Sequence, residues 1–202
     1  SETKFAYALL APSLILLAVL IGYPMLYNIV ISFQDVPINP NMASEMVGFK
    51  NYLSVFQDAE FYHSIFITLI FTVVVTVIST AIGLAIAVFM NREFVGKKIV
   101  NSIIILSYVV PAVCLIFAWR YMFNNIYGII NYIVVDVLKI ADEAPLWFDQ
   151  PLSAFILVTI FAIWKFYPYA YMSFTAILQS VDKSLYEAAD MDGATGWQKF
   201  MA

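Results

Sequence analysis

Charged residues are scarce in this chain. They make up 12% of its 202 residues, whereas hydrophobic residues make up 63%. Soluble domains are about 25% charged and about 45–50% apolar. A chain of this length cannot bury so much apolar surface in one water-soluble core, because burial is limited by the ratio of surface to volume. The composition therefore excludes an ordinary soluble globular protein and indicates that most of the chain lies in lipid.

Cysteine and histidine occur once each, as Cys114 and His63. A single cysteine excludes an internal disulfide, and the two residues together lack the spacing of a metal site. The sequence contains no G-x-x-x-x-G-K-[ST] phosphate loop and no plausible catalytic pair. Its few basic residues form no patch for nucleic acid. We therefore expect neither an enzyme nor a metal or other cofactor.

Four long apolar runs meet the requirement of about 20 mainly apolar residues for a membrane-crossing helix. They cover residues 5–33, 64–90, 99–122 and 154–178. A shorter apolar run, 127–140, predicts a short helix at the membrane surface. In the second run Ser79, Gly83 and Ala87 recur every fourth residue, a pattern that lets a neighbouring helix approach closely. The sequence predicts an all-α, polytopic helical membrane protein, folded as one transmembrane domain over 1–202.

The distribution of basic residues predicts the orientation of these spans. Six of them lie at the chain ends or in the link between the second and third runs: Lys4, Arg92, Lys97, Lys98, Lys183 and Lys199. The loops 34–63 and 124–150 hold only Lys50 and Lys139, against eight acids. Because basic residues favour the cytoplasmic side, we expect both ends of the chain to be cytoplasmic.

A polar stretch, LYEAADMDGATGWQKF (185–200), follows the fourth run. Ser184 and Glu187 have the spacing of a capping box, and Gly193 suits a left-handed helix stop. The pattern predicts a helix over about 185–192, too short to be stable alone. It must therefore dock on a surface, either a partner protein or the chain's own spans, through a face formed by Leu185, Ala188, Ala189 and Asp192.

The segment LQSVDKSLYEAADMDGATGWQKF resembles the EAA loop of binding-protein-dependent ABC importer permeases, in particular their sugar-importer branch. Similar resemblances lie in APSLILLAVLIGYPMLYNIVISF, AWRYMFNNIYGIIN and IWKFYPYAYMSFTAILQSV, so that nearly the whole chain is covered. Members have about six spans, and their loop continues into Ile-x-Leu-Pro. The chain therefore resembles the front part of a permease, cut inside its coupling loop.

The resemblance implies a division of labour between subunits. The EAA helix would sit in a cleft of an ABC ATPase subunit through Glu187, Ala188, Ala189, Asp192 and Gly193. A second permease subunit would complete the membrane part, and an extracytoplasmic solute-binding protein would deliver the sugar. The resemblance also implies a location in a bacterial cytoplasmic (inner) membrane, surrounded by lipid.

The fourth run contains a candidate substrate path. Trp164, Tyr167 and Tyr171 fall on one helical face, and aromatic faces with hydroxyls suit sugars. Lys165 is costly in hydrocarbon and should therefore face a cavity or a partner. Pro168 frees a backbone carbonyl near Trp164. A purely structural role for this cluster is an equally supported alternative.

Arg120, near the end of the third run, is expected to reach the membrane interface as an anchor. If it turns inward alongside Lys165, an anionic substrate becomes possible. Alternative functions are a permease for a polyol or for a sugar or glycerol phosphate. A secondary transporter or channel, a different class, would need midplane acids or an inverted repeat, and neither is visible in the sequence.

Overall fold

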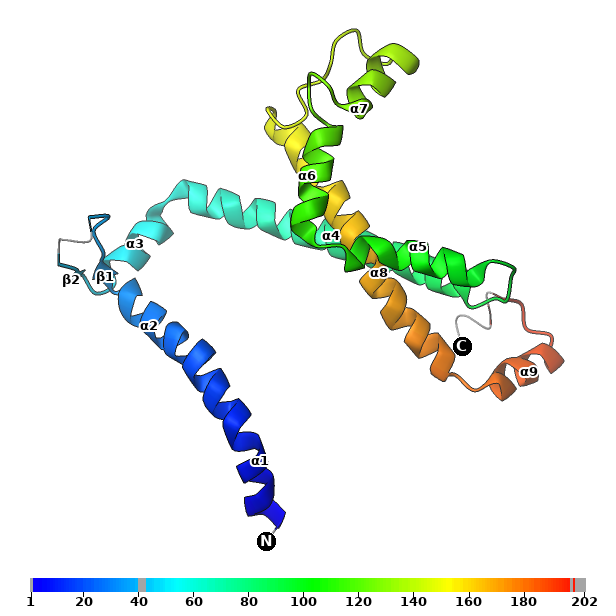
Figure 1. Ribbon diagram of the computed structural model, residues 1–202, viewed down its shortest axis with the longest axis horizontal. Coiled ribbons are helices and arrows are strands. Elements are labelled where there is room, and N and C mark those ends of the chain that lie inside the picture. Colours follow the sequence, from blue (N-terminus) through cyan, green and yellow to red (C-terminus); the bar gives the residue numbers. More distant parts are fainter. Residues whose placement is uncertain (1, 40–42, 197, 199–202) are drawn as a thin grey trace. The chain divides into compact units, whose positions relative to one another are not determined.

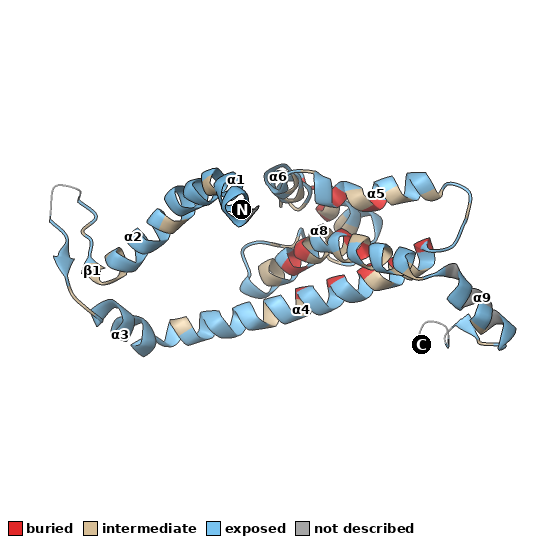
Figure 2. Ribbon diagram, turned by 90° about the horizontal axis from the view of Figure 1, so that it is seen from below, coloured by how far each residue is buried: buried red, intermediate tan, exposed pale blue. Residues whose placement is uncertain are grey.

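The computed structural model describes residues 2–39, 43–196 and 198, and of residues 2, 183, 186, 187 and 190 it describes the backbone alone. The chain forms two compact units, Ser1–Ile67 and Thr68–Ala202. Apart from two short strands, the regular elements in the described residues are helices. The predicted all-α class is confirmed. Figure 2 shows the buried positions on α4, α5 and α8, the helices that carry the second unit.

The first unit begins with a membrane-length helix, Thr3–Ser32, which confirms the first predicted span. It consists of α1 (Glu2–Leu17), the π-helical turn η1 (Ala18–Gly22) and α2 (Tyr23–Ser32). Pro24 lacks an N–H and cannot bond the carbonyl four residues earlier. The helix changes to π-helical hydrogen bonding over this turn. The N–H of Tyr23 bonds to the carbonyl of Ala18, five residues earlier instead of four.

The loop after α2 folds back onto the end of that helix. Its elements are β1 (Gln34–Asp35), which pairs antiparallel with β2 (Glu45–Met46), and α3 (Lys50–Gln57). The side-chain amide of Asn51 donates to the carbonyls of Ser32 at 3.0 Å and Gln34 at 2.9 Å. These bonds fasten α3 to the chain leaving the membrane helix.

The second predicted span is α4 (Ala59–Met90), a 32-residue helix. Its small-residue stripe is the contact surface that the sequence predicts, with Ser79, Gly83 and Ala87 all buried. A Cβ added to Gly83 would lie 2.6 Å from Cβ of Ala170 and 2.7 Å from the backbone nitrogen of Tyr171. Only glycine allows α4 to touch the backbone of α8 (Pro151–Ser180), the fourth predicted span.

The third predicted span, 99–122, is not one straight helix. It consists of α5 (Lys97–Val109) and α6 (Ala112–Met122), bent by 94° (Figure 1). The prediction of a continuous helix is wrong because Pro111 follows α5. Proline removes a backbone donor and pushes the residue before it out of the helical region. Val110 accordingly has extended backbone angles.

The apolar run 127–140 forms the short helix α7 (Ile129–Tyr132) and the π-helical turn η2 (Ile133–Val137). The predicted helix is therefore present, and its position at the membrane surface stays a prediction. The last element is α9 (Lys183–Met191). Among the described residues, three helices are long and apolar enough to cross a membrane, or four if α5 and α6 form one broken span.

Candidate functional site

Lys165 of α8 binds the end of α5. Its Nζ donates to the carbonyls of Ser107 at 2.7 Å, Tyr108 at 2.9 Å and Val110 at 2.7 Å. Ser107 and Tyr108 belong to the last turn of α5, where helical carbonyls have no partner within the helix, and Val110 is the residue directly after it. The ammonium group has three donors, so all of them are used. The positive charge also lies at the negative end of the helix dipole.

Ser107 of α5 forms a hydrogen bond in the opposite direction, to α8. Its buried Oγ donates to the carbonyl of Trp164 at 3.1 Å. That carbonyl is the one freed by Pro168, since residue 168 would otherwise donate to residue 164. The sequence predicts the free carbonyl but not its partner.

The two prolines therefore create matching defects. Pro111 removes the donor for the carbonyl of Ser107, and Pro168 removes the donor for the carbonyl of Trp164. Each helix supplies the bond that the other lacks: Lys165 from α8, and Ser107 from α5. We call these five residues the proline joint. Every freed carbonyl in it has a partner, as a membrane interior requires.

A cluster of six aromatic rings packs beside the joint, between α6, α8 and the loop before α8. Neighbouring ring centroids lie 5.3–6.5 Å apart, in the contact range for aromatic pairs. The members are Trp119, Phe123, Trp147, Phe148, Phe161 and Trp164. Trp164 therefore contacts Trp119 of α6, 6.1 Å between centroids.

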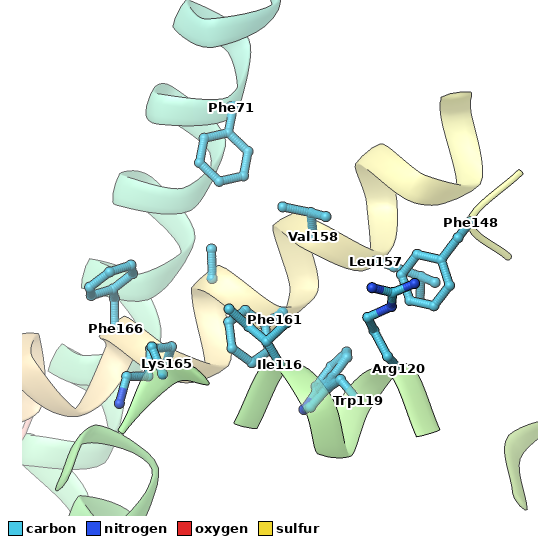
Figure 3. A pocket seen from close by; sticks show the side chains of 12 residues that line it. Phe71, Ile116, Trp119, Arg120, Phe148, Leu157, Val158, Phe161, Lys165 and Phe166 are labelled. Carbon is cyan, nitrogen blue, oxygen red and sulfur yellow. The ribbon is translucent and has the colours of Figure 1, made fainter. Parts of the chain in front are cut away.

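A cavity of about 550 Å³ lies along this cluster. We call it the α6/α8 cavity. It is lined by Phe71, Ala112, Ile116, Trp119, Arg120, Phe148, Leu157, Val158, Phe161, Ala162, Lys165 and Phe166. Figure 3 shows Lys165 at one end and Arg120 at the other. Lys165 thus borders a cavity, as its cost in hydrocarbon predicts, while its Nζ is bound by carbonyls.

The structure does not bring the four predicted path residues together in one cavity wall. Of these four, only Lys165 lines the α6/α8 cavity. Tyr171 is 3% exposed, and its hydroxyl donates to Oδ1 of Asn101 at 2.7 Å. Tyr167 is half-buried and packs against the same core cluster as Tyr171. A role for these side chains in transport stays a prediction.

The loop after α6 is fixed by four residues to which the sequence analysis assigns no role. The side-chain amide of Asn131, 5% exposed, donates to the carbonyl of Asn124 at 3.0 Å. Its Oδ1 accepts a bond of 2.6 Å from Nε1 of Trp147. Gly128 completes the turn, since a Cβ there would clash with the carbonyl oxygen of Asn124. The signal was present, because Asn124, Gly128 and Asn131 all belong to the motif AWRYMFNNIYGIIN.

The helix α9 begins two residues earlier than predicted, and a different residue caps it. Oδ1 of Asp182 accepts the backbone N–H of Ser184 at 2.9 Å, which is the geometry of an N-cap. This bond lowers the pKa of the Asp182 carboxyl. The predicted capping box is therefore wrong about Ser184, which lies inside the helix. The side chain of Glu187, its proposed partner, lies outside the described atoms.

Gly193 ends α9 as predicted. Its φ is +73°, in the left-handed region. The N–H of Ala194 bonds to the carbonyl of Ala189 at 2.9 Å, the six-to-one bond of the Schellman motif. Leu185 and Met191 are 64% and 89% exposed. The helix is thus fixed at both ends and leaves apolar side chains uncovered.

Lys165→Met should destabilise the proline joint. Methionine keeps an apolar stem but removes the donors for three carbonyls, a loss on the order of 2–3 kcal/mol in the free energy of unfolding. The measurement is thermal unfolding of the purified protein in detergent. Lys98→Met, which removes an exposed lysine, is the matched control. Equal unfolding temperatures for both variants would contradict the role of Lys165.

Comparison with known proteins identifies the family. Residues 79–202, more than half of the chain, match the family of binding-protein-dependent transport system inner membrane components. The inner membrane ABC transporter permease protein YcjO of Escherichia coli is 55% identical over 200 residues, covering 99% of this chain and 68% of that protein. The trehalose/maltose transport system permease protein MalF of Thermococcus litoralis is 33% identical, covering 98% and 66%.

A further relative and a solved structure are also similar to this chain. The sulfoquinovosyl glycerol transport system permease protein SmoG of Agrobacterium fabrum is 32% identical, covering 98% of this chain and 64% of that protein. A chain in the crystal structure of a bacterial ABC transporter that imports the acidic polysaccharide alginate has the same fold. Its TM-score is 0.80 at 22% identity, covering 99% of this chain and 66% of that one. This chain thus spans about two thirds of the length of its relatives. It belongs to the family of binding-protein-dependent transport system inner membrane components, and is a multi-pass permease of the inner membrane.

Proposed function

We propose that this chain is the transmembrane permease subunit of an ATP-driven importer for sugars or oligosaccharides. The observation that carries the proposal is α9. It is a helix of nine residues with a defined cap at each end and exposed apolar side chains at Leu185 and Met191. A helix this short is not stable alone, and uncovered apolar side chains favour a protein contact.

The partner that binds α9 is an ABC ATPase subunit, and this subunit hydrolyses the ATP. Contact is made through Glu187, Ala188, Ala189, Asp192 and Gly193. Both chain ends, and with them α9, then face the cytoplasm, in agreement with the distribution of basic residues.

The remaining partners are a second permease subunit and a solute-binding protein on the opposite side of the membrane. Support for the latter comes from the similar fold of a chain in the alginate transporter, crystallised in complex with an alginate pentasaccharide-bound periplasmic protein. Support for sugars as the substrate comes from the relatives, which are named for trehalose and maltose, for maltodextrin and for sulfoquinovosyl glycerol.

The substrate path runs along α8. Lys165 and the rings of Trp119 and Phe161 line the α6/α8 cavity, and Trp164 packs behind these rings. Tyr167 and Tyr171 follow Trp164 on α8, one and two turns further along, and pack in the core cluster. Flat aromatic faces suit the apolar faces of sugar rings.

An anionic sugar is the second candidate substrate. Arg120 and Lys165 line the same cavity. Lys165 is bound to three carbonyls, and no carboxylate in the described part of the chain pairs with Arg120. Arg120 is therefore the cation available to an acidic sugar. A polyol or a sugar phosphate is compatible with the same cavity.

Gly193→Val should uncouple the permease from its ATPase. Valine is strained at a φ of +73°, because its Cβ and branched side chain clash with the backbone there. The end of α9 should rearrange, while the membrane helices stay inserted. We expect less ATPase to co-purify with the full-length permease, and a weaker stimulation of ATP hydrolysis by the sugar-loaded binding protein.

Gly196→Val is the matched control for this test. Gly196 lies three residues further on, has no positive φ, and has open space where a Cβ would be. Its variant should therefore couple like the wild type. Normal ATPase association and stimulation in a stably expressed Gly193→Val permease would contradict the proposed role of α9.

Trp119→Ala and Trp164→Ala should both lower sugar uptake per assembled complex. The first removes a cavity wall, and the second removes the ring packed 6.1 Å behind it. Phe117→Ala is the control, since this ring lies on α6 like Trp119, is 67% exposed and does not line the cavity. The measurement is uptake in proteoliposomes normalised to the complex present. Equal losses of uptake in all three variants would contradict a substrate path through this cavity.

A further inference from the structure

The helix α3, in the loop after the first membrane helix, has one apolar and one polar face. Residues at the helical spacing i, i+3, i+4 and i+7 share one face, and in α3 these are aromatic or aliphatic. We call them the α3 stripe: Phe49, at the N-cap, Tyr52, Leu53 and Phe56. The polar residues on the opposite face are Lys50, Asn51, Ser54 and Gln57. This division is typical of a helix that lies along a boundary between water and an apolar phase.

The α3 stripe is largely uncovered. Phe49, Leu53 and Phe56 are 67%, 59% and 58% exposed, and Tyr52 is 37% exposed. The rings of Phe33, Phe49 and Tyr52 contact one another, with centroids 5.2–5.8 Å apart. A continuous set of exposed apolar side chains marks a contact surface.

Hydrogen bonds fix the start of α3 at the end of the first membrane helix. The side-chain amide of Asn51 donates to the carbonyls of Ser32 and Gln34, and the hydroxyl of Tyr52 forms a hydrogen bond with Oγ of Ser32. Ser32 is the last residue of the membrane-length helix Thr3–Ser32. The first turn of α3 therefore lies at the depth where that helix leaves the hydrocarbon.

The other end of α3 is fixed to α4. Asp58, with extended backbone angles, is the only residue between the two helices. Its Oδ1 accepts the backbone N–H of Glu60 at 2.9 Å, the geometry of an N-cap. The hydroxyl of Tyr62, in the first turn of α4, donates to the carbonyl of Phe56 at 2.9 Å. Figure 1 shows α3 between the end of α2 and the start of α4, so both of its ends are bound to membrane-length helices.

Lipid is the occupant of the α3 stripe that these contacts favour. Amphipathic helices at a membrane surface bury their apolar face about 5–10 Å into the boundary between headgroups and acyl chains, and tyrosine is enriched at this level. The stripe lies beside the end of α2, where Ile29 and Val30 are also exposed, by 54% and 51%. An apolar surface at this depth meets lipid without any further partner.

We propose that α3 is an interfacial helix, with the α3 stripe inserted between lipids and its polar face toward water. It anchors the loop 34–63 to the membrane surface. This role goes beyond the proposed function, because it depends only on the two flanking helices crossing the membrane and not on what is transported. A protein partner on the stripe, either the second permease or the solute-binding protein, is the alternative that the experiment below separates.

Spin labels on α3 test the proposal in the full-length permease, assembled with cysteine-free partner subunits in vesicles of phosphatidylethanolamine and phosphatidylglycerol. In a Cys114→Ala background, Leu53→Cys and Ser54→Cys each carry one nitroxide. Collisions of the nitroxide with oxygen, which concentrates in lipid, and with a water-soluble nickel chelate are measured by electron paramagnetic resonance. The ratio of oxygen to nickel collisions should be at least about threefold higher at residue 53 than at residue 54, because only residue 53 faces the acyl chains.

A second pair, Phe56→Cys and Gln57→Cys, should give the same order. All four positions are exposed, so cysteine replaces no buried side chain, and only assembled complex is measured. Equal ratios at residues 53 and 54 would overturn the proposal, since both faces would then lie in water. Few collisions with either reagent at residue 53 would also overturn it: at all times if the second permease covers the stripe, and only after addition of the solute-binding protein if that protein does.

Discussion

The fold of the second unit depends on one constraint, which is that a backbone carbonyl in hydrocarbon must have a hydrogen-bond donor. Pro111 and Pro168 each remove one donor from a membrane helix. In water the freed carbonyls would be hydrated. Here Lys165 and Ser107 supply the bonds across the interface between α5 and α8, and this exchange holds the broken span against the straight one.

The break at Pro111 also explains where the α6/α8 cavity lies. The 94° bend after α5 turns α6 away, so that aromatic side chains fill the space between α6 and α8 incompletely and leave the α6/α8 cavity. Gly83 brings α4 into contact with the backbone of α8. Lys165, which borders the α6/α8 cavity, has structural partners in the carbonyls at the end of α5.

Much of the architecture follows from sequence periodicity and composition. The long apolar runs predict the spans, the stripe at Ser79, Gly83 and Ala87 predicts the close helix contact, and Gly193 predicts the end of α9. The partners of Lys165 could not be derived, because they depend on tertiary contacts 55–58 residues apart in the chain. The break at Pro111 has a local cause, since proline lacks a donor and disfavours a helical residue before it, but a count of apolar residues does not register it. A helical-face argument also groups Trp164 with Tyr171, although the structure packs them against different neighbours. Asp182, rather than Ser184, caps α9; both residue types suit an N-cap, and spacing alone does not choose between two candidates two residues apart.

The exchange of bonds between the two prolines is tested most directly by a double-mutant cycle of Ser107→Ala and Pro168→Ala. Alanine at 168 restores the backbone donor for the carbonyl of Trp164, so the hydroxyl of Ser107 is no longer needed there. Thermal unfolding in detergent is measured for the wild type, both single variants and the double variant. Ser107→Ala should cost about 1 kcal/mol in the wild-type background and clearly less beside Pro168→Ala. Equal costs in both backgrounds would contradict the account.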